Sequence, residues 1–276
     1  MTPVYGGNEF VSIIIPTFNS ARFISVCLES VVGQQYPRLE TLVVDNYSND
    51  GTAKVAETFG ANVFLFSGTQ AAARNVGIAK SKGNYVLFLD SDQTLESGVI
   101  EDCTSICATL GVEAIKIPEV FVGLCFWGKC SALWKNNMVD DFDAESAIPR
   151  FYKKDKLLEQ RAFVDNLGWW EDQELYQRLK ASGLKEAWCT RKVVHYEVDS
   201  PRNTVRKYLS YGRSANSFGR IKTKGSVEMA FKFTISAMIR AIKNSRVSPR
   251  VFFGCLFLFV VRSFSGIIGF FSSLDR

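Results

Sequence analysis

Two aspartates one residue apart, Asp90 and Asp92, are the residues best suited to chemistry in this sequence of 276 residues. They follow the apolar run 85–89 (YVLFL), which is typical of a buried strand. Mg²⁺ and Mn²⁺ prefer oxygen ligands and bind jointly to one or two carboxylates and a substrate phosphate. The pair therefore predicts a divalent cation site that neutralises a departing diphosphate. The alternative is a pair of acids in a solvated surface turn.

Other polar residues also stand directly after apolar runs. Thr17 and Asn19 follow the run 11–16 (VSIIIP), and Asp45 ends the run 39–45 (LETLVVD). Asp45 could accept hydrogen bonds from a base or ribose, or it could cap the following turn. Arg74 lies early in an alanine-rich stretch, where it could clamp a ligand or form a surface ion pair.

A second acidic pair, Glu171-Asp172, directly follows Trp169-Trp170 at an expected helix start. Acids in a first helical turn complement the helix dipole, which is a purely structural role. The tryptophans offer a second interpretation, because aromatic faces stack on sugars. A carboxylate beside them could take the proton from an attacking hydroxyl group.

The elements that must position these residues alternate along the first half of the chain. Apolar, β-branched runs predict strands, and the stretches between them predict helices. The predicted strands are 11–16, 39–45, 62–66, 85–89 and 114–117, and the predicted helices are 20–32, 50–59, 70–80 and 95–110. This α/β alternation favours right-handed βαβ units on a mostly parallel sheet. Ligands bind at the carboxyl ends of such strands, where the polar residues above are expected to meet.

The pattern loosens from about residue 119. Further expected elements are a strand at 150–154, a helix at 171–182 and a strand at 192–197 that carries His195. Because no linker separates the two halves, we expect the second half to extend the same domain over the ligand edge of the sheet.

Charge is distributed unevenly along the chain. The net charge is +5, but residues 201–276 contain 14 Lys and Arg against Glu228 and Asp275, a balance of +12, which leaves −7 for residues 1–200. A basic C-terminal part indicates an anionic partner, namely a lipid surface, a nucleic acid or a phosphate-bearing substrate. No nucleic acid partner is expected, because the basic residues lack the interleaved aromatic pattern of a single-strand-binding fold.

The C-terminal part is also apolar. Residues 227–243 place polar side chains on one stripe of a helix, which suits a membrane interface. Residues 251–271 carry one charge, Arg262, near the middle. A pair of core helices, an interfacial or re-entrant membrane element and a true span all remain possible for this segment.

Several classes of protein are excluded or disfavoured. The sequence contains no P-loop, no G-x-G-x-x-G and no G-x-S-x-G. A single histidine excludes a zinc site built from several histidines. Seven cysteines, an odd number, and the lack of a secretory leader at the start of the sequence predict a reducing, cytosolic location.

Four segments together resemble glycosyltransferase family 2, whose members have the GT-A fold. They are VSIIIPTFN (11–19), LVVDNYSNDGT (42–52), AARNVGIAKSKGNYVLFLDSD (72–92) and WEDQELYQRLKASG (170–183). The resemblance covers about residues 10–200. It implies a Rossmann-like, mostly parallel sheet flanked by helices, and an inverting, metal-dependent transfer from a nucleotide-sugar donor.

The resemblance also implies roles for individual residues. Asp172 would be the general base and Glu171 would place the acceptor, with Trp169 and Trp170 beside it. Asp90, Asp92 and His195 would serve the Mn²⁺ or Mg²⁺ ion. The nucleotide-sugar would be held by Pro16, Thr17, Asn19, Asp45, Arg74, Asp90 and Ser91. Asn46 and Gln93 depart from the family pattern, since acids are frequent at both positions, and the donor base and sugar stay undecided.

On this basis we expect four regions. Residues 1–9 form a tail, 10–118 the nucleotide-sugar half, 119–200 the acceptor half, and 201–276 a hydrophobic, basic helical extension that associates with an anionic membrane surface. The acceptor would be a glycan or lipid-linked glycan, at the cytoplasmic side of the cell membrane. The alternatives are a polyprenyl-phosphate glycosyltransferase, a nucleotidyltransferase and a non-catalytic membrane-bound sensor of sugar nucleotides.

Overall fold

A computed structural model describes residues 9–139, 147–167, 170–221 and 248–272. The chain forms two compact units. Unit 1 comprises Met1–Glu119, Ile148–Asn166 and Glu171–Val194, and unit 2 comprises Val120–Ala147, Leu167–Trp170 and His195–Arg276. The chain therefore leaves unit 1 after Glu119 and returns to it twice. The assignment of binding roles to sequence ranges stays a prediction.

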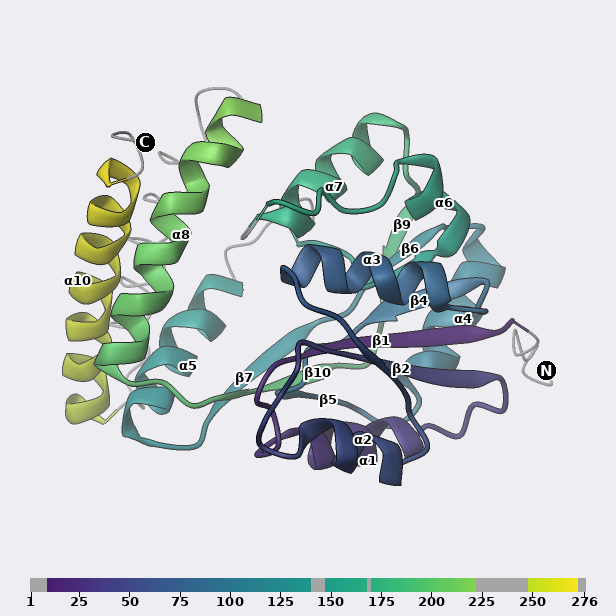
Figure 1. Ribbon diagram of the computed structural model, residues 1–276, viewed down its shortest axis with the longest axis horizontal. Helices are drawn as coiled ribbons and strands as arrows, with labels where there is room; N and C mark the ends of the chain where they lie inside the picture. Colours follow the sequence, from purple (N-terminus) through teal and green to yellow (C-terminus); the bar gives the residue numbers. More distant parts are fainter. Residues whose placement is uncertain (1–8, 140–146, 168–169, 222–247, 273–276) are drawn as a thin grey trace. The chain divides into compact units, whose positions relative to one another are not determined.

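A seven-stranded sheet is the centre of unit 1 (Figure 1). In spatial order its strands are β3 (Asn62–Leu65), β2 (Leu39–Asp45), β1 (Val11–Thr17), β4 (Tyr85–Phe88), β8 (Phe151–Lys153), β6 (Ala114–Lys116) and β9 (Glu186–Trp188). Strand β1 pairs in parallel with β2, where Thr17 lies opposite Asp45, and with β4, where Ile14 lies opposite Phe88. Only β8 runs antiparallel to its neighbours in this sheet. The expectation of a mostly parallel sheet is confirmed.

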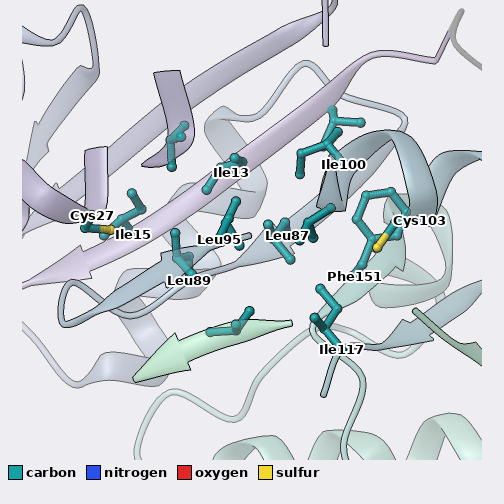
Figure 2. Close-up of a cluster of buried hydrophobic side chains, with 14 of the residues drawn as sticks. Ile13, Ile15, Cys27, Leu87, Leu89, Leu95, Ile100, Cys103, Ile117 and Phe151 are labelled. Atoms are coloured by element: carbon teal, nitrogen blue, oxygen red, sulfur yellow. The ribbon is translucent and has the colours of Figure 1, made fainter. Parts of the chain in front are cut away.

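Both faces of this sheet are buried, as a parallel sheet requires. Alternate residues of β1 point to opposite faces, so Ile13 and Ile15 join one core and Ile14 joins the other. The first core includes side chains of α1 (Ile24–Val32), α2 (Thr52–Thr58) and α4 (Val99–Leu110), and Figure 2 shows part of it. The second core includes side chains of α3 (Gln70–Lys80), α6 (Lys154–Glu159) and α7 (Glu171–Ala181).

Helix α3 lies unusually close to the sheet. Its first turn is capped by Thr69, whose hydroxyl accepts a hydrogen bond from the Ala72 amide. Further along, Gly77 faces Ile14 of β1 so closely that a Cβ atom at position 77 would overlap the Ile14 side chain. This close approach determines where Arg74, one turn earlier, can reach.

The helix predicted from residue 95 begins later than expected. Leu95 ends a short strand, β5 (Gln93–Leu95), and α4 starts only at Val99 after Gly98, whose φ is +80°. The short strand belongs to a second sheet with the order β5-β10-β7, in which β10 is Val193–Glu197 and β7 is Glu119–Gly123. Because residues 93–95 are extended, the Gln93 side chain reaches back to the preceding turn, where it accepts a hydrogen bond from the Asp90 amide.

Unit 2 contains the helices α5 (Phe126–Val139), α8 (Pro201–Ile221) and α10 (Pro249–Phe271). Its small core includes Cys130, Cys255 and Leu258. Gly212 of α8 and Gly269 of α10 each face backbone of the other helix, leaving no room for a Cβ atom. The apolar C-terminal helix expected at 251–271 is confirmed, and the helix expected at 227–243 lies outside the described residues.

Candidate active site

The carboxyl ends of β1, β2 and β4 lie side by side, and each bears polar residues. At the end of β1 the Thr17 hydroxyl donates a hydrogen bond to Asp45 Oδ1, at 2.8 Å. Asp45 ends β2, and Asp90 follows β4 by two residues. The sheet therefore brings three of the predicted segments to one edge, as βαβ topology requires.

Asp45 is fully buried, and its carboxylate is occupied by donors from this chain. Besides Thr17, Ser48 donates through its amide to Oδ2 at 2.8 Å and through its hydroxyl to Oδ1 at 2.6 Å. The loops after β1 and β2 are joined in the same way, because the amide of Asn19 donates to the Ser48 hydroxyl and the Asn19 side chain accepts from Asn49. In this arrangement Asp45 organises the two loops, and a direct contact with a nucleoside stays a prediction.

The Asp90-Ser91-Asp92 turn is half-buried. Asp90 Oδ1 accepts hydrogen bonds from Gln70 Nε2 at 3.1 Å and from Arg74 Nη2 at 3.2 Å. The Ser91 hydroxyl contacts the Ser20 hydroxyl at 2.8 Å. Burial, followed by the charges of Asp92 and then Asp90, raises the pKa of the Cys27 thiol.

Arg74 connects the turn to the second acidic pair. Its Nη1 donates to Glu171 Oε1 at 2.9 Å, while Nη2 reaches Asp90. The guanidinium carbon lies 5.8 Å from the ring centre of Phe88 and 5.5 Å from that of Phe163. Arg74 Nε is buried and has no hydrogen-bond partner within the described part of the chain. The surface ion pair considered as an alternative is wrong, because this arginine is buried and bridges two acids.

Glu171 and Asp172 occupy the first turn of α7 and differ in exposure. The Glu171 side chain is buried, whereas Asp172 is exposed. Burial raises the pKa of Glu171 to about 7, with Arg74 opposing the shift and Asp172 adding to it. The two neighbouring carboxylates therefore differ in their access to solvent. Asp172 is accessible to a substrate hydroxyl, whereas Glu171 is held by Arg74.

Three functional candidates were absent from the sequence-based predictions. Arg150 precedes β8, and its guanidinium contacts Glu119 Oε2 at 2.7 Å and Asp90 Oδ2 at 3.8 Å. Burial lowers the pKa of Arg150, but the carboxylates of Glu119, Asp90 and Asp172 raise it above its ordinary value. The side-chain oxygen of the fully buried Gln93 accepts a hydrogen bond from the Arg150 guanidinium. The sequence offered two signals for them. Arg150 is a basic residue beside an expected strand, and Gln93 is an amide at a position where the family often has an acid.

The residues at this edge suit a hard divalent cation. Within the described ranges, no three His, Cys, Asp or Glu side chains group closely enough to hold a metal on their own. Mg²⁺ commonly uses one or two carboxylates and completes its shell with substrate phosphates and water, so the half-buried Asp90-Ser91-Asp92 turn fits such an ion. Which of the two carboxylates would bind the ion stays a prediction.

Three further predicted residues belong to unit 2. His195 on β10 packs against Phe121, with ring centres 5.1 Å apart, and its Nε2 lies 3.9 Å from Glu197 Oε1. Trp170 is 38% exposed and has a φ of +78°. Trp169 lies outside the described residues. Roles for these residues in metal or acceptor binding stay predictions. A cavity of about 380 Å³ in unit 1 is lined by Glu159, Gln160, Arg161, Val164, Glu174 and Arg178, none of them a predicted site residue.

The chain belongs to glycosyl transferase family 2, because residues 12–165, more than half of the chain, match that family's sequence profile. It is 43% identical over 104 residues to the glycosyltransferase AglE of Haloferax volcanii. The matched region covers 33% of this chain and 34% of AglE. It is 32% identical over 103 residues to the poly(ribitol-phosphate) β-N-acetylglucosaminyltransferase TarS of Staphylococcus aureus. This matched region covers 34% of this chain and 18% of TarS. The chain thus matches about a third or less of the length of these relatives.

Solved structures share the fold over nearly the whole chain. The mannosyltransferase PcManGT from Pyrobaculum calidifontis, in complex with GDP-Man and Mn²⁺, has a TM-score of 0.57 at 17% identity, covering 99% of this chain and 87% of that one. S. aureus TarS 1–349 in complex with UDP-GlcNAc has a TM-score of 0.55 at 14% identity, covering 96% and 90%. The expected fold, a mostly parallel sheet flanked by helices with an apolar C-terminal helix, is confirmed.

Proposed function

We propose that this protein is an inverting glycosyltransferase that moves a sugar from a nucleoside-diphosphate sugar to a hydroxyl of a glycan or lipid-linked glycan. The observation that carries the proposal is the Arg74 bridge between Asp90, at the sheet edge, and Glu171, beside Asp172. This bridge connects the segment suited to a diphosphate with the segment suited to a base. The neighbouring folds that bind GDP-Man or UDP-GlcNAc support the donor class.

The chain's own residues suggest a single displacement. Asp172, exposed at the start of α7, takes the proton of the acceptor hydroxyl. The acceptor oxygen forms a bond to the anomeric carbon as the bond from that carbon to the diphosphate oxygen breaks, and the electron pair leaves with the diphosphate. Attack opposite the leaving group inverts the anomeric configuration. Glu171, held by Arg74, keeps the helix start in place.

A divalent cation held by Asp92, with Asp90 nearby, would stabilise the negative charge of the departing diphosphate. Arg74 and Arg150 surround the Asp90 carboxylate with two cations, so this edge carries positive charge as well as acids. Both features favour an anionic, phosphate-bearing donor.

The proposal includes association with an anionic membrane surface through unit 2. Helix α10 is the one helix among the described residues long and apolar enough to cross a membrane, judged by length and composition. Its exposed apolar side chains are spaced one, three or four residues apart, which places them on one face of the helix. They form the α10 stripe, made of Phe253, Leu256, Phe257, Val260, Phe264, Ile267, Ile268 and Phe271. Arg262 is buried on the opposite side and donates to the Ser131 hydroxyl at 2.7 Å. A stripe of this kind suits the interfacial arrangement better than a span exposed on all sides.

A donor screen followed by a transfer assay tests the proposed function. UDP-, GDP- and dTDP-sugars are each added with Mn²⁺, and thermal shift identifies the donor that binds. Transfer of the labelled sugar to a glycan or lipid-linked glycan acceptor, with release of the nucleoside diphosphate, is the expected result. Release of pyrophosphate from a nucleoside triphosphate would indicate a nucleotidyltransferase instead. Donor binding without any turnover would indicate a sensor, and either outcome would overturn the proposal.

A further inference from the structure

A closed ring of hydrogen bonds lies directly behind the Asp90-Ser91-Asp92 turn. Gln93 Nε2 donates to Glu119 Oε1 at 2.9 Å, and Arg150 Nη2 donates to Glu119 Oε2 at 2.7 Å. Arg150 Nη1 closes the ring by donating to Gln93 Oε1 at 3.2 Å. All three residues belong to unit 1, and they come from three separate parts of the chain.

The ring is attached to the turn at two points. The Asp90 amide donates to Gln93 Oε1 at 3.0 Å, so the ring holds the backbone of the turn. Arg150 Nη1 lies 3.8 Å from Asp90 Oδ2, so the ring also faces the carboxylate. One buried amide oxygen therefore receives both the turn's backbone and the arginine that faces its side chain.

The amide of Gln93 matches the partners around position 93, and an ionised carboxylate would not. A glutamine both accepts and donates, and here its oxygen meets two donors while its nitrogen meets a carboxylate. A glutamate at position 93 could not donate to Glu119. Its negative charge would lie within hydrogen-bond distance of the Glu119 carboxylate. Like charges so close together repel strongly at a buried site.

We propose that Gln93 is a positioning residue: through the Glu119–Arg150 ring it fixes the Asp90-Ser91-Asp92 turn in the geometry that binds the cation and the donor diphosphate. This inference rests on the proposed function and adds to it the reason for a glutamine at this position. Residues that hold a metal-binding group from behind commonly change metal affinity 10- to 100-fold when they are altered.

The test exchanges the roles of the two residues. Gln93→Glu removes the donor and adds a charge, whereas the double variant Gln93→Glu, Glu119→Gln restores one donor and one acceptor across the same contact. Binding of Mn²⁺ alone is measured by electron paramagnetic resonance, and binding of UDP, GDP and dTDP in the presence of Mn²⁺ by calorimetry. Gln35→Glu, which adds the same charge at an exposed position, is the matched control.

We expect Gln93→Glu to weaken Mn²⁺-dependent nucleotide binding by at least about tenfold. The double variant should recover to within about threefold of the wild type, and Gln35→Glu should not differ from it. A purely structural role predicts changes in unfolding temperature without this selective recovery of binding. If Gln93→Glu does not fold, Gln93→Met, which removes the hydrogen bonds without adding charge, should show the same loss.

Three outcomes would overturn the inference, and they distinguish its failure from that of the proposed function. Wild-type affinity in a folded Gln93→Glu variant, or a folded double variant as weak as the single one, would refute the positioning role alone. A wild-type protein that binds none of UDP, GDP and dTDP with Mn²⁺ would refute the proposed function, and with it the inference.

Discussion

Arg74 on α3 and Glu171 at the start of α7 form a buried ion pair, 2.9 Å from Nη1 to Oε1, although 97 positions separate them. The contact joins two segments that the sequence marks independently. It also requires Glu171 to share a cation with Asp90, so the three groups are expected to respond together to substitution.

Removing the cation should affect both acids. Arg74→Met leaves Asp90 and Glu171 without the shared guanidinium, and breaking a buried pair in this way destabilises by about 3–5 kcal/mol. We expect the additional substitution Glu171→Gln to recover part of the lost unfolding free energy, because it removes the uncompensated charge. Urea unfolding of both single variants and the double variant completes the cycle. Strictly additive losses would show that the two side chains do not interact.

Replacing the proposed base should separate chemistry from binding. Asp172→Asn keeps the size of the side chain but cannot accept the proton, so transfer should fall by about 10²–10⁴-fold. The affinity for the donor, measured by calorimetry, should stay within about threefold, since Asp172 is not assigned to the donor. Glu159→Gln changes an exposed acid on α6 and serves as the control. Undiminished transfer by Asp172→Asn would exclude it as the base.

Removing the proposed metal ligand should make donor binding insensitive to the cation. Asp92→Ala is expected to lose the enhancement that Mn²⁺ gives to binding of the donor identified in the screen, and to bind at the level of the metal-free wild type. Calorimetry with and without Mn²⁺ measures both states. A variant that still responds fully to Mn²⁺ would place the ion elsewhere.

The buried Glu171 predicts a pH dependence of stability. Its pKa is raised from 4.5 to about 7, so the folded protein keeps this proton to higher pH than the unfolded chain does. Unfolding therefore releases a proton between about pH 4.5 and pH 7, and this group's contribution falls as the pH rises through that window, by up to about 3 kcal/mol. Glu171→Gln should lack the decline. Urea unfolding at pH 5, 6, 7 and 8 compares the two proteins, and parallel pH profiles would contradict the prediction.

The α10 stripe should determine membrane binding. Phe257→Ser with Phe264→Ser removes two exposed phenyl rings, so co-sedimentation with anionic vesicles should weaken by at least about tenfold. Val32→Ser with Leu110→Ser, which changes side chains of comparable exposure in unit 1, should have no effect. High salt should weaken binding only in part, since it screens the basic residues and leaves the apolar contact. Equal binding by both double variants would argue against this surface.

Local signals in the sequence were sufficient for much of this protein. The strand runs ending near Thr17, Asp45 and Asp90, and the helix start at Glu171, are patterns of neighbouring residues, so their elements and the edge they share were predictable. The start of α4 was not, because Leu95 satisfies the apolar pattern of a helix but pairs as a strand. Helix α5 was also missed, since its apolar residues follow no clear helical period.

Which side chains meet was decided by the tertiary structure alone. The residue pattern was enough to predict acids and an arginine at the ends of buried strands and near helix starts, because hydrophobic periodicity is a local property. The pairing of Arg74 with Glu171, and the ring of Gln93, Glu119 and Arg150, depend on how closely helices approach the sheet and on which strand returns beside β4. Those distances are properties of packing between distant segments, and no spacing within one segment encodes them.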